Sequence, residues 1–85
     1  GTWYDEEDIA YFKSSFAKKG HPSVLEVQTK LANIGYKLEL SGVQDLQSQF
    51  AVRAFQARYT PEHMDGFLDN ETNAAIFAIE KKYRQ

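Results

Sequence analysis

The residues best suited to metal chemistry in this 85-residue chain are its two histidines, His21 and His63. A zinc hydrolase site takes three protein ligands in tight geometry. The chain has no cysteine, and the two histidines form neither an H-x-x-x-H nor an H-x-H pair. Both also fall in segments that we predict to be loops. We therefore expect two surface imidazoles and no metal site.

Nucleophilic catalysis would need a serine or threonine beside a histidine and an orienting acid. Ser23 lies close to His21 in the sequence, but it also precedes Glu26 by three residues. That spacing is a capping-box pattern, which explains Ser23 without catalysis. The carboxylates lie at predicted helix starts or on charged faces, and no glycine-rich phosphate loop is present. The residues predict no catalytic site, so a binding or docking module is expected.

Charge and composition restrict the possible partners. The formal net charge is −2 and the pI is about 5.6, whereas nucleic acid is normally held by a basic face. A DNA-reading helix over residues 46–59 would offer Arg53 and Arg58, but the acidic balance argues against it. No apolar run approaches the roughly 20 residues that span a bilayer. We expect one soluble monomeric domain that binds no nucleic acid.

Helical periodicity runs through the first half of the chain. In residues 5–19, Ile9, Phe12 and Phe16 recur on one helical face, and Gly20 follows as a stop. A second helix is predicted to begin after Ser23 and to end at Gly35. Its apolar stripe consists of Val24, Val27, Leu31 and Ile34. Residues 36–42 alternate in polarity and predict a short extended connector.

The second half of the chain contains an internal repeat, because residues 66–83 echo residues 42–59 at a spacing of 24. The matched pairs are Gly42 and Gly66, Asp45 and Asp69, Ala51 and Ala75, Ala54 and Ala78, and Tyr59 and Tyr83. Each aspartate is placed as the N-cap of a helix. A fixed spacing of this kind indicates one turn-plus-helix unit used twice. The predicted fold is all-α: a compact three-helix bundle preceded by an extra N-terminal helix.

Residues 23–83 resemble the small helical peptidoglycan-binding domain found beside bacterial cell-wall hydrolases. The resemblance rests on the order of Leu25, Gln28, Leu31, Gly35-Tyr36, Ala51-Val52, Phe55-Gln56, Asp65-Gly66 and Thr72. Many members of that family carry glycine where this chain has Asp69. The resemblance implies a three-helix domain that grips murein.

A closer resemblance is to the carboxy-terminal domain of zinc N-acetylmuramoyl-L-alanine amidases. Residues 54–83 contain F-Q, aromatic-x-P, D-G and D-x-E-T in that order, and "GTWYDEEDIAYF" is similar to the end of an amidase catalytic domain. This implies that residues 1–22 are a helix or linker from the end of a preceding amidase-like domain, and that residues 23–85 are the binding domain. Zinc and catalytic residues would belong to the missing domain, so no cofactor is expected here. The implied location is the bacterial cell envelope, periplasmic or extracellular.

Seven residues are candidates for a ligand groove beside the predicted Asp65-Gly66 turn. Each could instead have a purely structural role. Gln56 could join its helix to the loop through its side-chain amide, Asp65 and Gly66 could simply form the turn, and Thr72 could belong to the start of a helix. The aromatic rings could stack on sugars or pack in the core, and the arginine could meet stem-peptide carboxylates or solvent. The candidates are Tyr36, Arg53, Gln56, Asp65, Gly66, Phe67 and Thr72.

Two functions stay open at this point. The first is binding of peptidoglycan, through its glycan strand or its stem peptide, to target a tethered amidase. The second is protein–protein docking, on the chain's own catalytic domain or on another protein. Trp3 and Phe77, an aromatic residue off the apolar stripe of its helix, favour docking.

Overall fold

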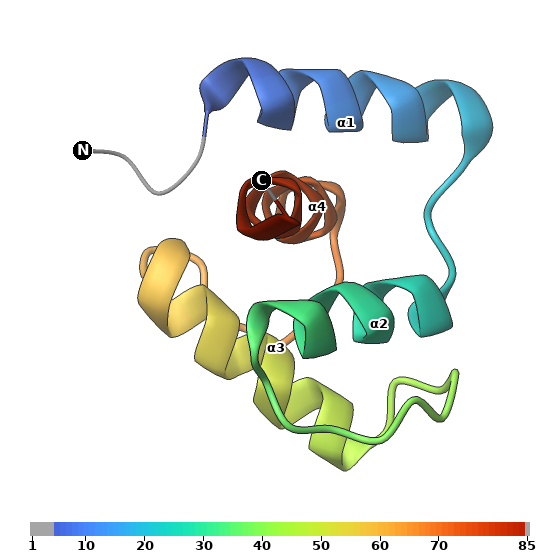
Figure 1. The fold of residues 1–85 in the computed structure, drawn as a ribbon, viewed down its shortest axis with the longest axis vertical. Coiled ribbons are helices and arrows are strands. Elements are labelled where there is room, and N and C mark those ends of the chain that lie inside the picture. Colours follow the sequence, from blue (N-terminus) through green and yellow to red (C-terminus); the bar gives the residue numbers. More distant parts are fainter. Residues whose placement is uncertain (1–4, 85) are drawn as a thin grey trace.

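The computed structural model describes residues 5–84, which form four helices and, within that range, no strand. In Figure 1 they follow one another as α1, α2, α3 and α4. Their bounds are Glu6–Lys19 for α1, Val24–Ile34 for α2, Leu46–Tyr59 for α3 and Asn70–Arg84 for α4. The predicted all-α fold, with one helix ahead of a three-helix unit, is confirmed. Trp3 lies outside the described residues.

Helix α4 is the centre of the domain. Figure 1 shows it nearly end-on, with α1 on one side and α2 and α3 on the other. Every residue from 72 to 80 is buried, so this helix has no solvent-facing stripe along that stretch. Ala74, Ala75 and Ala78 supply small side chains where neighbouring helices approach. A helix that is enclosed on several faces in this way is a core helix rather than an amphipathic surface helix.

Helix α1 packs on α4 through aromatic rings. The Phe77 ring centroid lies 5.5 Å from that of Phe12 and 5.1 Å from that of Phe16, both in edge-to-face contact. Ile9 also packs against the core, as its spacing predicts. Phe77 is therefore a core residue that α1 covers. It does not support docking to another protein, contrary to the sequence-based interpretation.

A buried carboxylate joins α2 to α4. Glu80 is 1% exposed, and it accepts hydrogen bonds from Asn33 and Arg84, both at 2.8 Å, with Lys30 at 3.5 Å. Burial opposes ionisation, but the bonds from Asn33 and Arg84 and the nearby charges lower the pKa of Glu80. The carboxylate is thus compatible with the core because its charge is matched by these partners.

Aspartate or serine side chains cap the N-termini of three of the described helices. Ser23 accepts from the Glu26 N–H at 3.1 Å, Asp45 from that of Ser48 at 3.1 Å, and Asp69 from that of Thr72 at 2.8 Å. These are the N-caps that the sequence predicts, and they satisfy backbone donors that a helix start leaves unpaired.

Among residues 5–84, no helix combines the length and apolarity needed to cross a bilayer.

Candidate ligand-binding site

Gln56 is the centre of a hydrogen-bond network that holds the loop between α3 and α4. Its side chain is fully buried, and its Oε1 accepts from the Gly66 N–H at 2.8 Å. Its Nε2 lies 3.0 Å from the Thr72 hydroxyl, 3.2 Å from an Asp65 carboxylate oxygen and 3.4 Å from the Phe67 carbonyl oxygen. Both ends of the amide are therefore used by the protein itself, and Gln56 ties the helix to the loop.

Gln28 makes the same arrangement in the first half of the domain. Its Oε1 accepts from the Gly42 N–H at 2.8 Å, and its Nε2 donates to the buried Ser48 hydroxyl. Gly42 and Gly66 both have φ of 78°, a conformation that favours glycine. The turn glycine and the helix start that the two copies of the sequence repeat share are thus alike in structure. In each copy they are held by a glutamine of the preceding helix. Because this arrangement occurs twice in the domain, we interpret the role of the Gln56 network as structural.

The loop held by Gln56 presents several side chains to solvent. Phe67 is 69% exposed, and Asp65 and Arg53 are also exposed. A Cβ added to Gly66 would lie 2.8 Å from the Arg53 side chain, so the arginine stem lies directly over the turn. We call the group Arg53, Asp65 and Phe67 the turn surface. It is a small exposed surface mounted on a rigidly bonded loop.

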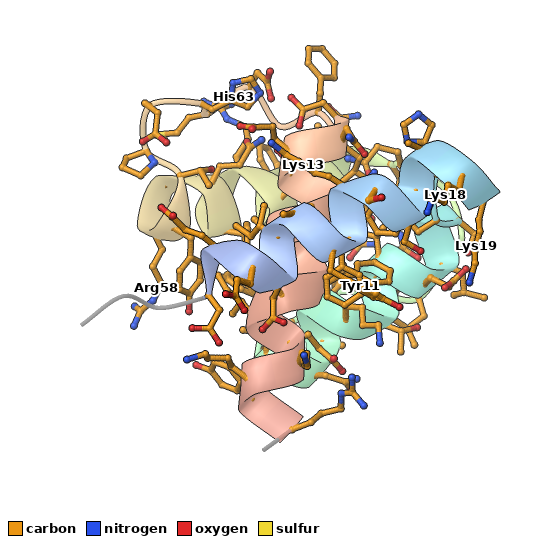
Figure 2. The ribbon with its side chains drawn as sticks, turned by 90° about the horizontal axis from the view of Figure 1, so that it is seen from above. Tyr11, Lys13, Lys18, Lys19, Arg58 and His63 are labelled. Carbon is orange, nitrogen blue, oxygen red and sulfur yellow. The ribbon has the colours of Figure 1, made fainter. Side chains whose placement is uncertain are left out.

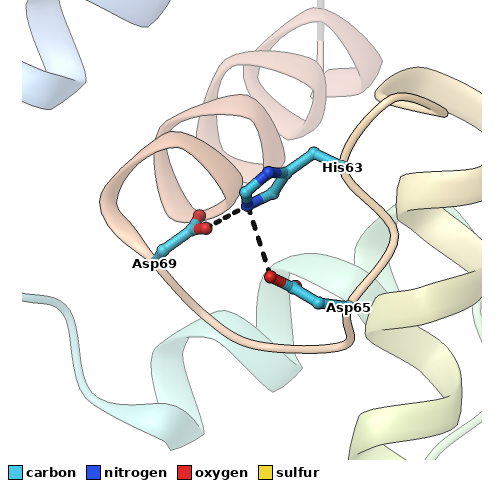
Figure 3. Close-up of side chains that lie close together, drawn as sticks. All are labelled: His63, Asp65 and Asp69. Carbon is cyan, nitrogen blue, oxygen red and sulfur yellow. Dashed lines mark hydrogen bonds and ion pairs between the residues drawn. The ribbon is translucent and has the colours of Figure 1, made fainter.

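His63 lies beside this surface, between two carboxylates (Figure 3). Its Nε2 contacts an oxygen of Asp69 and lies 3.5 Å from an oxygen of Asp65. The bond to Asp69 and the charge of that carboxylate raise the pKa of His63. The Phe67 N–H bond lowers the pKa of Asp65. For Asp69, burial acts in the opposite direction, but the bond from the Thr72 N–H lowers the pKa.

His63 was expected to be a surface imidazole, and its convergence with the two aspartates was not predicted from the sequence. The only signal was the spacing of His63, Asp65 and Asp69 within seven residues of a predicted loop. Loop residues have no fixed periodicity, so their spacing did not predict that the three side chains converge.

Tyr36 lies apart from the other candidates, in an open pocket of about 260 Å³ at the C-terminal ends of α2, α3 and α4. Its ring packs edge-on against Phe55 at 6.3 Å, and burial raises its pKa. In Figure 2, Arg58 of this pocket and His63 of the loop occupy separate places on the molecule. We call this site the tyrosine pocket. It is lined by Ile34, Gly35, Tyr36, Arg58, Tyr59 and Tyr83.

The structure therefore divides the seven candidates. Six belong to the loop between α3 and α4 and to the residues that it contacts: Arg53, Gln56, Asp65, Gly66, Phe67 and Thr72. Among them, Gln56, Gly66 and Thr72 are buried within the domain, while the other three face solvent. Only the exposed three can meet a large ligand without a rearrangement.

The fold and these sites can be compared with known proteins. A family model described as "Putative peptidoglycan binding domain" matches residues 20–76, which is most of the chain. The chain belongs to this peptidoglycan-binding domain family. The search of curated proteins found no significant match to this chain.

Two solved structures resemble this chain over all or nearly all of its length. The crystal structure of AmpDh3 from Pseudomonas aeruginosa matches 100% of this chain with a TM-score of 0.87 and 33% identity. A structure of AmpDh3 in complex with anhydromuramic pentapeptide matches 98% of it, with a TM-score of 0.85 and 34% identity. This chain spans only 33% and 32% of those two chains, respectively. The match includes α1; that residues 1–22 come from the end of a preceding domain stays a prediction.

Proposed function

We propose that this domain is a non-catalytic murein-binding module that targets a tethered N-acetylmuramoyl-L-alanine amidase to the bacterial cell wall. The observation that carries the proposal is the match of the entire chain to one third of AmpDh3. The family match and the sequence resemblance to amidase C-terminal domains support it. The location would be the cell envelope, periplasmic or extracellular, and the amidase zinc and its ligands would belong to the catalytic domain.

We place the murein contact on the turn surface. The exposed Phe67 ring offers an apolar face for a sugar ring or an N-acetyl methyl group. Arg53 offers a guanidinium for the carboxylates of a stem peptide. The Gln56 network fixes the loop before the ligand arrives, so little ordering of the protein opposes binding.

A surface as small as the turn surface is expected to bind a single murein site weakly. Weak binding is sufficient for a module that targets a tethered enzyme to a polymer. Tethering two modules raises the effective concentration at the second site to about millimolar for a short flexible linker. An amidase held to an insoluble polymer in this way rebinds before it diffuses away. The domain therefore needs only a modest affinity for each murein site.

We expect Phe67→Ala to weaken sedimentation of the domain with purified sacculi severalfold while thermal melting stays close to wild type. Phe67 is 69% exposed, so removing its ring should change stability by no more than about 0.5 kcal/mol. Tyr83→Ala tests the tyrosine pocket, because Tyr83 is 57% exposed there. Tyr11→Ala is the matched control, an exposed ring on α1.

The three variants together show which surface contacts murein. Loss of binding in Phe67→Ala alone supports the turn surface. Full binding by Phe67→Ala together with loss in Tyr83→Ala would move the murein contact to the tyrosine pocket. Loss in Tyr11→Ala as well would mean that any exposed ring matters, and would contradict a defined site.

Docking onto a tethered catalytic domain is the second candidate function. Three apolar side chains at the start of α3 and just before it are largely exposed: Val43, Leu46 and Phe50. Exposed apolar residues of this kind are typical of interaction surfaces when they are contiguous. Murein binding by the isolated domain would favour the first function, since docking alone predicts none.

A further inference from the structure

We propose that His63, Asp65 and Asp69 form a binding site for one divalent transition-metal ion, with Zn²⁺ as the ion that suits it best. This site would lie on the binding domain itself, next to the turn surface. It is separate from the amidase zinc discussed above, and it does not depend on the proposed murein contact.

Three donor atoms converge at this place. One ligand atom from each of the three side chains lies within 4.8 Å of the other two. Figure 3 shows both carboxylates pointing toward the same imidazole nitrogen, Nε2 of His63. An ion placed among the three atoms would have one nitrogen and two oxygen ligands. Zinc takes these ligand types, and a three-ligand set leaves the fourth tetrahedral position for water.

The other oxygen of each carboxylate is held by groups outside the cluster. Asp65 Oδ1 accepts from the Phe67 N–H at 3.0 Å and from Gln56 Nε2 at 3.2 Å. Asp69 Oδ1 accepts the capping bond from the Thr72 N–H at 2.8 Å. These bonds leave Oδ2 of each aspartate directed at the imidazole. Hydrogen bonds to the ligands of a metal orient them and strengthen binding in this way.

The histidine is also positioned by its backbone. The His63 N–H donates to the Thr60 carbonyl oxygen at 2.9 Å across the turn that contains Pro61. All three side chains remain partly exposed, so an ion can reach them from solvent. The site therefore needs no opening of the fold before it binds.

The ligand set also discriminates between ions. Ca²⁺ and Mg²⁺ prefer oxygen ligands in larger number, and Mg²⁺ releases its waters reluctantly. An imidazole nitrogen with two carboxylates suits zinc and its neighbours in the first transition row. Bound there, the ion would link the loop after α3 to the N-cap residue of α4, on either side of the exposed Phe67.

The test is a titration of the whole chain with ZnCl₂, followed by calorimetry and by NMR of the histidine rings. We expect one equivalent to bind saturably, to shift the His63 ring signals, and to raise the melting temperature; MgCl₂ should do none of these. His63→Ala should weaken binding by at least about tenfold, as losses around metal ligands commonly do. Asp69→Asn should weaken it too while keeping a side-chain oxygen for the helix cap.

His21→Ala is the matched control, since His21 is an exposed histidine that does not belong to the cluster. It should bind zinc like the wild type. His63 is itself exposed, so His63→Ala should keep its helical signal and its melting temperature without metal near that of the wild type. Zinc affinity unchanged in His63→Ala, or His63 signals unmoved by one equivalent of zinc, would overturn the proposal.

Discussion

Replacing Gln56 with alanine is expected to destabilise the domain by about 3 kcal/mol, because the buried partners of its amide lose their bonds. The Gly66 N–H and the Thr72 hydroxyl would be left unpaired next to a cavity. Alanine is the better helix former, so helix propensity would not cause the loss. For a domain of this size, 1 kcal/mol corresponds to about 4–8 °C in melting temperature, so thermal and urea unfolding would both detect it.

Gln28→Ala should cost a comparable amount, since Gln28 holds Gly42 and Ser48 in the same manner. Gln49→Ala is the control: Gln49 is an exposed amide whose Nε2 donates to the Gln44 carbonyl oxygen. Its loss should be no more than about 0.5 kcal/mol. A Gln56→Ala variant that melts like Gln49→Ala would contradict the architectural role and return Gln56 to the ligand candidates.

Phe77→Ala is expected to cost about 3–5 kcal/mol and to loosen α1, because a buried ring between two helices is lost. Phe12 and Phe16 of α1 both pack on this ring. The ion pair of Lys81 with Asp8, at 2.8 Å, would remain, but partly exposed ion pairs of this kind contribute little. Amide hydrogen exchange across residues 6–19 reports the loosening directly, since α1 should then open without global unfolding.

The wild-type domain should protect the amides in the middle of α1 almost as well as those of α4. Phe67→Ala serves as the comparison for the loss of one phenyl ring without core burial. Fast exchange throughout α1 in the wild type, or unchanged α1 protection in Phe77→Ala, would show that α1 does not depend on this packing.

The sequence predicted the helices well because their signals are local. Ser23, Asp45 and Asp69 cap the helices that their spacing indicates, and Gly35 ends α2 with φ of 120°. Phe77 was misinterpreted for a physical reason. A single apolar stripe predicts one buried face, whereas α4 is enclosed by α1 on one side and by α2 on another, and periodicity does not predict a second buried face.

The candidate site was predicted less completely. Gln56, Gly66 and Thr72 do lie together around the α3–α4 loop. This was predictable because the sequence indicates a helix that ends shortly before the Asp65-Gly66 turn. Tyr36 lies elsewhere, since the direction of the connector after α2 depends on tertiary packing that no local pattern encodes. The convergence of the His63 and Asp69 side chains likewise depends on the path of the loop, which contains no repeating pattern.

The most direct test of murein binding is sedimentation of the isolated wild-type domain with purified sacculi over a range of murein concentrations. If the domain binds murein, the pelleted fraction rises with the murein concentration and saturates, and soluble murein fragments compete for the domain. A folded domain that stays in the supernatant at every murein concentration would contradict murein binding and would favour docking onto a catalytic domain.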